Sequence, residues 1–485
     1  MELQVVIEGD RDQPDQLYRQ LKEAINSGEL EAGRRLPASR QLALQLGISR
    51  KVVAEAYARL SYDRLVVGRI GSGTYVSEHG RRQPLVQAPP ELSGAAIIER
   101  WRSLPTPLRR PLPVAATRAR YELVGGLPDR SLFPQDDWRR SVLHGLRQTE
   151  RHATGHGDAR GVPALREAIA RHIAFARGVR CEPDDIVVTN GAQQALDLVA
   201  RVLIEPGSTV VVEEPGYPPA RLLFTGQGAN VVGVPVDREG IEVDLIPDGT
   251  RLIYTTPTHQ YPLGMAMSPR RRSALLDRAR ALGAIVIEDD YDSEFRYEGR
   301  PADALQGLDD HGSVAFVGSL SKTLSSDLRL GYLVAPQAIL EAVGNAKYLA
   351  DWHTSTPMQW ALARFIDSGD LLRHLRRCQA AYAARRARIG ECIDGRLAPW
   401  LERVPTTAGL HLTALFHAPI DTRRLVAHAW RAGVAVDALD ACYHFLSPVS
   451  GLMFGFGGID LGDIDAAIDR LSDVLMQLHP LPVEP

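Results

Sequence analysis

The sequence has few cysteines and no long run of uncharged apolar residues. Its four cysteines (Cys181, Cys378, Cys392 and Cys442) are scattered without a CxxC spacing, which argues against a disulfide framework and a zinc site. No segment approaches the roughly 20 apolar residues of a membrane span, and no apolar stretch of a secretory signal follows Met1. We therefore expect a cytoplasmic protein with reduced thiols and with neither a metal site nor a membrane segment.

The near-neutral overall charge conceals a local asymmetry. A chain of 485 residues with 45% apolar and 24% charged residues is typical of a globular protein with two or three domains. Its formal net charge is −3, yet residues 1–33 contain three basic and eight acidic side chains, and residues 34–76 contain eight basic and two acidic ones. We therefore expect a basic face on the second segment, as nucleic-acid-binding units have.

The first 77 residues have the pattern of three helices followed by two short strands. Periodicity predicts helices over 15–27, 39–46 and 50–60, and β-rich runs predict strands over 65–67 and 74–76. Gly28 and Gly47 end the first two helices, and Ser49 is placed to cap the third. This order predicts a small α+β winged helix-turn-helix domain over residues 1–77.

Polar residues fall where such a domain contacts DNA. Ser49, Arg50 and Lys51 begin the second helix of the pair, the end that enters the major groove. Arg40 is near the start of the first helix, where phosphates lie, and Arg69 is at the tip of the wing. Taken singly, these side chains are equally consistent with a solvated basic edge on a small helical domain.

The string LPASRQLALQLGISRKVVAEAYARL, followed by GSGTYV, resembles the GntR family of bacterial regulators almost continuously over residues 36–76. The resemblance implies DNA contacts by Arg40, Ser49, Arg50 and Gly71. Residues 62–64 depart from the family, because a glycine usually precedes the wing there. Arg64 would add a phosphate contact, or the turn would differ.

A segment rich in proline and arginine, residues 78–120, follows this domain. Its prolines and weak periodicity predict a linker that is extended where prolines cluster. Its arginines could contact DNA, but a solvated spacer between two domains is the simpler interpretation.

From residue 184 onward, β-rich runs alternate with helical segments such as 194–203 and 269–282. The expected strands are 186–189, 209–213, 230–234, 251–254, 284–288, 313–317 and 330–334. Several are almost wholly apolar, as strands covered on both faces are. The alternation predicts an α/β domain with a mainly parallel sheet, whose ligands bind in loops at the carboxyl ends of the strands.

Chemically suggestive residues follow three of these strands. Residues 189–194, TNGAQQ, make a glycine turn that opens a helix and can seat a phosphate. The adjacent acids Asp289 and Asp290 each need a partner at a strand end, either a cationic ligand group or a local salt bridge, for instance to Arg296. Lys322 follows a third strand. A phosphate seat, an acid, a phenol and a lysine together match the needs of pyridoxal 5′-phosphate.

From about Tyr121 to Leu478 the chain resembles the fold-type I aminotransferases, through the strings GGLPDRSLFP, GDARGVPALREAIA, TNGAQQALDL, EEPGYPP, IEDDYDSEFRY and SLSKTLSSDLRLGYL. The resemblance assigns residues 121–485 to one large domain. It implies Lys322 as the Schiff-base lysine, with Asp289 on the pyridine nitrogen and Tyr291 on the phenolate oxygen. The remaining implied cofactor contacts are the stacking ring of Tyr217 and the phosphate ligands Ala192, Gln193, Ser319, Ser321 and Arg329. Asp290 is the alternative nitrogen partner.

A GntR-like domain joined to an aminotransferase-like domain resembles the MocR/GabR-type transcriptional regulators over almost the whole chain. In that group a dimeric large domain senses pyridoxal phosphate, alone or with an amino compound, and controls binding to promoter DNA. Full catalytic turnover is not the expected output. The alternative is a working aminotransferase with an attached DNA-binding domain.

Three departures from the group bear on the effector. His156 stands where the group has a tyrosine that reaches the partner subunit's cofactor phosphate, and its charge would depend on pH. Met453 and the pair Pro218-Pro219 replace two arginines that grip a carboxylate. These losses favour pyridoxal phosphate itself, as in regulators of vitamin B6 synthesis, or an amine without a carboxylate. His259 would line the pocket or have a structural role.

Overall fold

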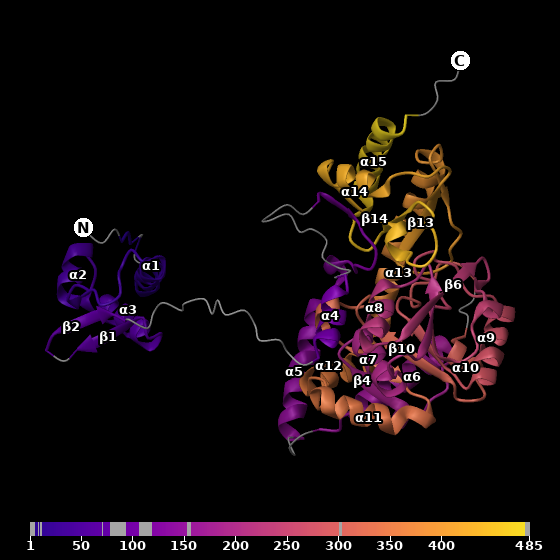
Figure 1. The fold of residues 1–485 in the computed structure, drawn as a ribbon, viewed down its shortest axis with the longest axis horizontal. Helices are drawn as coiled ribbons and strands as arrows, with labels where there is room; N and C mark the ends of the chain where they lie inside the picture. The colour runs from indigo at the N-terminus through magenta and orange to yellow at the C-terminus, as the bar shows by residue number, and fades with distance from the viewer. Residues whose placement is uncertain are drawn as a thin grey trace. The chain divides into compact units, whose positions relative to one another are not determined.

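The computed structural model describes residues 5–7, 9, 12–69, 71–77, 94–105, 119–152, 157–299 and 303–480. The chain divides into two compact units, residues 1–95 and 96–485, which we describe separately (Figure 1). None of the helices in the described ranges is long and apolar enough to cross a membrane.

The first unit is a winged helix-turn-helix, as predicted. Its elements are α1 (Gln13–Ser27), α2 (Ser39–Leu46), α3 (Arg50–Tyr62), β1 (Val66–Arg69) and β2 (Gly73–Val76). β1 and β2 pair antiparallel, with Val66 opposite Val76. One fully buried leucine or valine from each helix, such as Leu21, Leu42 and Val53, packs into a single core. The expected cap also forms, since the Ser49 side chain accepts a hydrogen bond from the Val52 amide.

The turn before the wing explains the departure from the family pattern. Arg64 adopts φ 57°, the left-handed conformation that glycine reaches most easily. The preceding Asp63 holds the turn, because its carboxylate accepts hydrogen bonds from the Tyr18 hydroxyl at 2.5 Å and the Lys22 ammonium at 2.7 Å. In this chain, therefore, an arginine adopts the left-handed conformation of the turn, and side-chain hydrogen bonds to Asp63 hold it.

The large unit is built on an eight-stranded sheet in the order β4-β11-β10-β9-β8-β5-β6-β7. Its strands are β4 (Ile186–Thr189), β5 (Thr209–Glu214), β6 (Asn230–Asp237), β7 (Gly240–Ile241), β8 (Thr250–Thr255), β9 (Ile285–Asp290), β10 (Val314–Ser319) and β11 (Gly331–Val334). Every strand predicted beyond residue 184 occurs in this sheet. The β10-β9, β9-β8, β8-β5 and β5-β6 pairs are parallel, while β11 runs antiparallel to both of its neighbours. The predicted mainly parallel α/β fold is confirmed.

Helices cover both faces of this sheet. They are α5 (Gln135–Arg151), α6 (Pro163–Arg177), α7 (Ala192–Leu203), α8 (Pro218–Gln227), α9 (Pro269–Leu282), α10 (Leu305–Leu308), α11 (Gln337–Asp351) and α12 (Thr356–Asp367). On β4, Ile186 and Val188 pack with α6 and α12, whereas Val187 packs with α7 and α11. The central residues of the strands are mostly apolar because both faces of the sheet are buried.

A second sheet of five strands, which we did not predict, has the order β12-β13-β15-β14-β3. Its strands are β3 (Tyr121–Leu123), β12 (Leu401–Arg403), β13 (His411–Phe416), β14 (Val434–Ala438) and β15 (Gly451–Gly455), and its helices are α13 (Asp370–Gly395), α14 (Thr422–Arg431) and α15 (Ile464–Leu478). Figure 1 shows this part, apart from the purple β3, in the orange-to-yellow range of the chain. Leu412, Val436 and Leu452 face a core shared with α13 and α15. Alternate residues therefore face the opposite way.

Part of the segment predicted as a linker is helical. α4 (Ala95–Ser103) lies within residues 78–120, and Trp101 on it lies so close to Gly226 of α8 that a Cβ there would meet its ring at 2.7 Å. Residues 78–93 and 106–118 lie outside the described ranges.

Candidate cofactor site and DNA-binding unit

Three strands bring the predicted residues to one edge of the main sheet. β9 and β10 run parallel, with Asp290 opposite Gly318. β4 ends at Thr189, which lies in one row with Gly331 and Ser319. The glycine turn after β4, the acids at the end of β9 and the lysine after β10 therefore gather at the carboxyl ends of the strands.

Lys322 is half-buried against the loop that follows β3. Its Nζ donates a hydrogen bond to the Gly126 carbonyl oxygen at 2.7 Å. Gly126 has φ 76°, and a Cβ on it would lie 2.6 Å from that Nζ, so this contact requires glycine. Burial lowers the pKa of Lys322, and the carboxylates of Asp292 and Asp289 oppose that shift. A lowered pKa increases the fraction of neutral amine, the form that attacks an aldehyde.

Asp289 is buried with one oxygen satisfied and one not. The Tyr254 hydroxyl donates to Oδ2 at 2.8 Å, whereas Oδ1 has no hydrogen-bond partner among the described residues. Burial raises the pKa of Asp289 to about 7, and the hydrogen bond from Tyr254 opposes the rise. A buried carboxylate oxygen without a partner is costly, so this atom is suited to a protonated ring nitrogen.

Asp290 has a different environment from its neighbour. Its Oδ2 lies 2.8 Å from Nε of Arg177 in a buried ion pair, and the Ser293 hydroxyl donates to the same oxygen at 2.6 Å. Arg177, rather than Arg296, is therefore its salt-bridge partner. Since Asp290 is already paired, the geometry favours Asp289 as the acid that meets a ligand.

The turn after β4 has the features of a phosphate seat. α7 begins at Ala192 after Gly191, which has φ 82° and provides no side-chain cap for the free amides of the first turn. Arg329 Nη2 donates to the Asn190 carbonyl at 2.8 Å, and a Cβ on Gly191 would lie 3.1 Å from the guanidinium. Gln193 follows in the same first turn of α7.

The two serines lie on the neighbouring strand end. Ser319 is the last residue of β10, and its Oγ accepts a hydrogen bond from the Ser321 amide at 3.1 Å. Ser319 lies in the row that includes Thr189, beside the glycine turn. Hydroxyls, amides and a guanidinium thus converge where a phosphate would bind.

A support for the turn that sequence reasoning missed is Asp351, at the end of α11. Its Oδ2 accepts hydrogen bonds from the side chains of Asn190 at 2.6 Å and Gln194 at 2.7 Å. The fully buried Lys347 ammonium lies 2.6 Å from its other oxygen. No local pattern indicates this role, because Asp351 lies about 160 positions further along the sequence.

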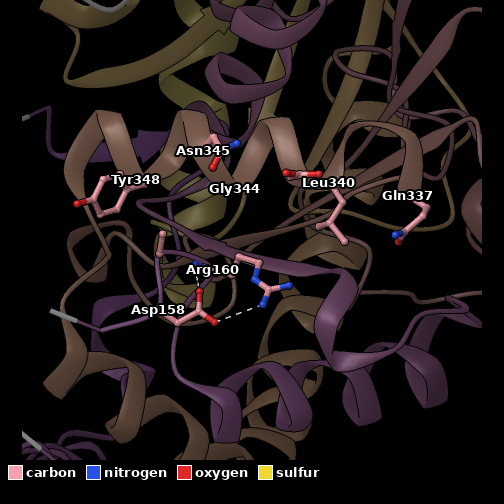
Figure 2. Close-up of a pocket in the computed structure, with 9 residues that line it drawn as sticks. Asp158, Arg160, Gln337, Leu340, Gly344, Asn345 and Tyr348 are labelled. Atoms are coloured by element: carbon pink, nitrogen blue, oxygen red, sulfur yellow. Dashed lines mark hydrogen bonds and ion pairs between the residues drawn. The ribbon is translucent and has the colours of Figure 1, made fainter. Parts of the chain in front are cut away.

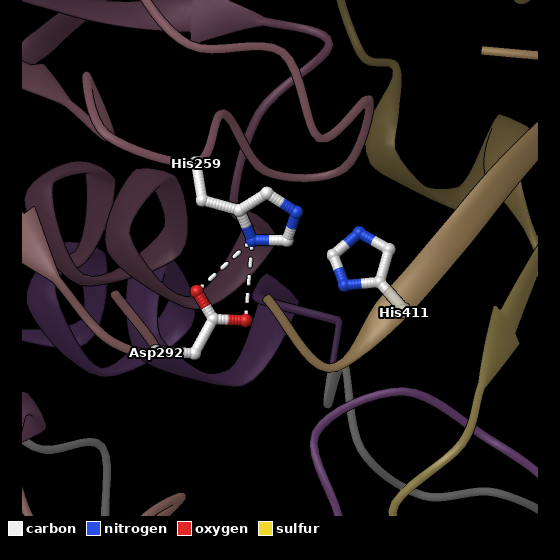
Figure 3. A group of neighbouring side chains, drawn as sticks. All are labelled: His259, Asp292 and His411. Atoms are coloured by element: carbon white, nitrogen blue, oxygen red, sulfur yellow. Dashed lines mark hydrogen bonds and ion pairs between the residues drawn. The ribbon is translucent and has the colours of Figure 1, made fainter. Parts of the chain in front are cut away.

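Tyr291 contacts a buried pair formed by His259 and Asp292. Figure 3 shows this pair together with His411. The His259 Nδ1 atom lies 2.9 Å from an oxygen of Asp292 and 2.9 Å from the Tyr291 hydroxyl. A carboxylate only accepts hydrogen bonds, so Nδ1 carries the proton and donates it. The Tyr291 oxygen then accepts from the same N–H, which leaves its own proton for another acceptor.

His411 completes a cluster of His259, Asp292 and His411 that could hold a metal ion by composition. Its Nε2 donates to the Pro262 carbonyl at 2.9 Å, and burial with the neighbouring His259 lowers its pKa to about 4. His411 is therefore neutral. His259 Nδ1 and His411 Nε2 therefore both carry protons, and the buried His259 Nε2 has no hydrogen-bond partner among the described residues. The pair of His259 and Asp292 supports the Tyr291 hydroxyl.

Tyr217 belongs to an aromatic wall of the same site. Its ring lies edge-on to that of Tyr261, with centroids 5.4 Å apart, and the ring of Tyr261 lies 6.0 Å from that of Tyr291. Burial raises the pKa of Tyr217 to about 12, and Asp289 adds to the rise. The wall is therefore uncharged, as a surface that stacks on a heteroaromatic ring should be.

His156, which we predicted near a cofactor phosphate, lies outside the described residues. The chain is described again from residue 157, and Asp158 and Arg160 line a cleft of about 500 Å³ against α11 (Figure 2). Glu341 and Tyr348 line the opposite side. This cleft contains none of the predicted cofactor residues.

The predicted DNA-binding side chains are exposed on the first unit. Arg40 is on α2, and Arg50 and Lys51 begin α3 just after the Ser49 cap. Gly71, with φ 75°, lies in the wing turn. Arg69 at the end of β1 lies over the Tyr75 ring, 4.8 Å from its centroid.

The first turn of α3 is electrostatically unfavourable in isolation. It contains Arg50 and Lys51 and no acidic residue. Cations at the positive end of a helix cost stability, about 0.3 to 1 kcal/mol each, whereas anions are favoured there. A phosphate group near this helix end would itself be favoured there, and it would make the positive charges of Arg50 and Lys51 stabilising.

Two family models match the chain. Residues 13–76 match the bacterial regulatory proteins of the gntR family, and residues 128–395 match the aminotransferase class I and II family. Among solved structures, the kynurenine aminotransferase of Pyrococcus horikoshii is similar to the large unit, with a TM-score of 0.69 and 28% identity over 76% of this chain and 96% of that one.

Curated relatives cover both units at once. The probable rhizopine catabolism regulatory protein MocR of Rhizobium meliloti is 34% identical over 98% of this chain and 96% of its own length. The pyridoxine biosynthesis transcriptional regulator PdxR of Corynebacterium glutamicum is 31% identical over 95% of this chain and 96% of its own length. The chain therefore belongs to the MocR-type transcriptional regulators, in which a GntR DNA-binding domain is joined to an aminotransferase class I and II domain.

Proposed function

We propose that this regulator binds pyridoxal 5′-phosphate at Lys322 and that the bound cofactor, alone or with an amino compound, controls its binding to promoter DNA. The observation that carries the proposal is the buried Oδ1 of Asp289, which has no partner among the described residues. The relative PdxR is named for pyridoxine biosynthesis, which supports the vitamer as the signal.

Pyridoxal phosphate supplies, when bound, an aldehyde that can bond covalently to a lysine amine. Lys322 would provide that amine, and Gly126 would hold it in position beforehand. Asp289 would accept a hydrogen bond from the protonated pyridine nitrogen at Oδ1 and so keep that nitrogen protonated. Tyr291 would donate its remaining hydrogen bond to the phenolate oxygen, because His259 already donates to the Tyr291 oxygen.

The phosphate would bind at the first turn of α7. The amides of Ala192 and Gln193 point out of a helix that has no side-chain cap. Arg329 adds a positive charge, and Ser319 and Ser321 add hydroxyl groups on the adjacent strand end. Neutral aromatic rings, Tyr217 among them, would flank the cofactor ring.

We further propose that the working form is a homodimer, in keeping with repeated half-sites on DNA. Large apolar side chains on α5 and α11 and just beyond are exposed: Leu143, Leu146, Tyr348, Leu349 and Trp352. Leu349, with 80% of its surface exposed, is the most prominent. Sedimentation of the native chain and of Leu349→Asp would test this, and a monomeric native chain would contradict it.

The central test is a gel shift on the DNA upstream of the protein's own coding sequence, with and without pyridoxal phosphate. We expect sequence-selective binding whose strength or pattern changes with the cofactor. Lys322→Ala should lose both the visible absorbance band of the bound cofactor and the cofactor-dependent shift. Absence of selective binding under both conditions would overturn the proposal.

Multiple turnovers in a transamination assay would instead support an aminotransferase with an attached DNA-binding domain. This alternative is supported by the presence of every kind of residue expected to hold the cofactor: the lysine, the acid and the phosphate ligands. The native protein, saturated with cofactor, should be incubated with a panel of amino donors and keto acids. A single stoichiometric conversion at most is the result we expect.

A further inference from the structure

The C-terminal end of α8 has a slot in which α4 lies (Figure 1). The slot is formed by Gly226, near the end of α8, and Gly228, just after it. A Cβ on Gly226 would lie 2.7 Å from the edge of the Trp101 ring, and a Cβ on Gly228 would lie 2.7 Å from the Arg100 guanidinium. The Trp101 ring can therefore lie here only because Gly226 has no side chain. Glycine lowers the stability of a helix, so this contact accounts for its presence in α8.

The other end of α8 lies at the cofactor site. Tyr217, the proposed stacking ring, immediately precedes Pro218, the first residue of α8. Within the helix, the ring of Phe224 packs edge-on against that of Tyr254, with centroids 6.1 Å apart. The Tyr254 hydroxyl in turn donates to Asp289 at 2.8 Å. α8 thus connects to two groups of the cofactor site, one through the chain and one through packed rings.

α8 is held as a rigid body, whereas α4 is held loosely. Ala220 and Phe224 of α8 are fully buried, and Tyr217 packs against the same core. Close-packed elements shift as units and do not deform continuously, so a displacement at Tyr217 is carried to the slot at the other end. On α4, by contrast, Trp101 is 48% exposed and Ile97 is 58% exposed. Few buried apolar contacts hold α4, as is typical of segments that open locally.

We propose that the seat of α4 in the α8 slot is the contact through which the bound cofactor acts on DNA binding. A cofactor ring placed against Tyr217 and Asp289 would shift α8 and so change how firmly the slot holds Trp101. Among the described residues, α4 is the first helix after the wing strand β2, so the chain enters the large unit through it. This rests on the proposed function and names the part of the large unit that transmits the signal.

Gly226→Ala tests the seat without harming α8, because alanine favours a helix more than glycine while its methyl group takes the place of the Trp101 ring. Trp101→Ala removes the ring itself. The measurement is the ratio of DNA affinities with and without pyridoxal phosphate, with the absorbance of the bound cofactor followed in parallel. We expect a ratio of about fivefold or more for the native protein. In both variants the cofactor should still bind and the ratio should fall to about one.

Glu99→Gln is the matched control on α4. Glu99 is exposed and lies two positions before Trp101, so it is on a different side of the helix. This variant should retain the native ratio. The double variant Gly226→Ala/Trp101→Ala should lose no more than either single one, because both changes remove the same contact.

Hydrogen exchange of the α4 amides gives a readout that does not involve DNA. The cofactor should change their protection in the native protein and leave it unchanged in Gly226→Ala. The inference is overturned if both single variants retain the native ratio, or if exchange in native α4 does not respond to the cofactor. A native protein whose DNA binding is independent of pyridoxal phosphate would refute the proposed function, and the inference with it.

Discussion

Replacing Asp289 with asparagine should stabilise the cofactor-free protein while weakening its hold on the cofactor. The carboxylate is buried, and its only hydrogen bond among the described residues comes from the Tyr254 hydroxyl. An asparagine oxygen can accept the same bond in the same volume. The substitution therefore removes a buried charge, and the amide nitrogen takes the place of the oxygen that has no partner.

The magnitude follows from the pKa of Asp289, which rises from 3.8 to about 7 on folding. Above the lower value the unfolded chain releases its proton while the folded chain retains it, so this group destabilises the fold increasingly as pH rises. The full shift corresponds to about 4 kcal/mol, of which about 2 to 3 kcal/mol develops between about pH 5 and about pH 8. Asparagine cannot ionise and avoids that loss.

Urea unfolding of the cofactor-free native and Asp289→Asn proteins at about pH 5 and about pH 8 measures this difference in the free energy of unfolding. All six tryptophans lie beyond residue 95, so their fluorescence reports the large unit alone. The stability gain of the variant should grow by about 2 to 3 kcal/mol from the lower to the higher pH. Added pyridoxal phosphate should stabilise the native protein far more than the variant.

Asp290→Asn is the matched control, because it removes the adjacent acid and takes a carboxylate away from the buried Arg177 guanidinium. It should destabilise the protein at both pH values, by about 3 to 5 kcal/mol. The reasoning is refuted if the gain of Asp289→Asn is independent of pH, or if that variant is the less stable protein at the higher pH.

Three further changes test other parts of the structure. Arg50→Ala should weaken DNA binding about tenfold. In titrations at several salt concentrations it should also lower the slope of log affinity against log salt concentration by about one, whereas Arg19→Ala on α1 should change neither quantity. Ser49→Ala should cost the first unit about 1 kcal/mol in thermal unfolding followed by circular dichroism, through loss of the helix cap. His259→Phe should lower cofactor affinity in an absorbance titration and destabilise the large unit by about 1 to 3 kcal/mol, because Asp292 loses a buried donor.

The parts of the site that could be predicted are those in which chemistry and secondary structure are encoded within a few residues. Lys322 and Ser319 end an apolar run, and Asp289 ends another, so their place at strand ends follows from the runs themselves. The parallel order then requires that such ends meet at one edge. The helix cap at Ser49 is local in the same sense.

The parts that could not be predicted depend on contacts between distant segments. The ion pair that distinguishes Asp290 from Asp289 joins residues 113 positions apart, and Tyr254 reaches Asp289 across 35 positions. The second sheet pairs β3 with β14, more than 300 residues away along the chain. A three-residue strand such as β3 has too few positions to show a period, and its pairing is decided by tertiary packing.

The buried acids carry an energetic cost that a bound cation would relieve. A ligand shifts a protein between states only by the difference in its affinity for them. Burial raises the pKa of Asp289 and Glu288 to about 7 and that of Glu294 to about 8, so the cofactor-free protein holds several acids in an unfavourable environment. A cation at Asp289 Oδ1 removes the largest part of that cost for Asp289 and leaves the other acids as they are. The free energy released at one atom is then available to order the elements that meet there, the end of β9 and the loops beside β4 and β10. A site without this cost would release less free energy at this atom, so less would be available to order the neighbouring elements.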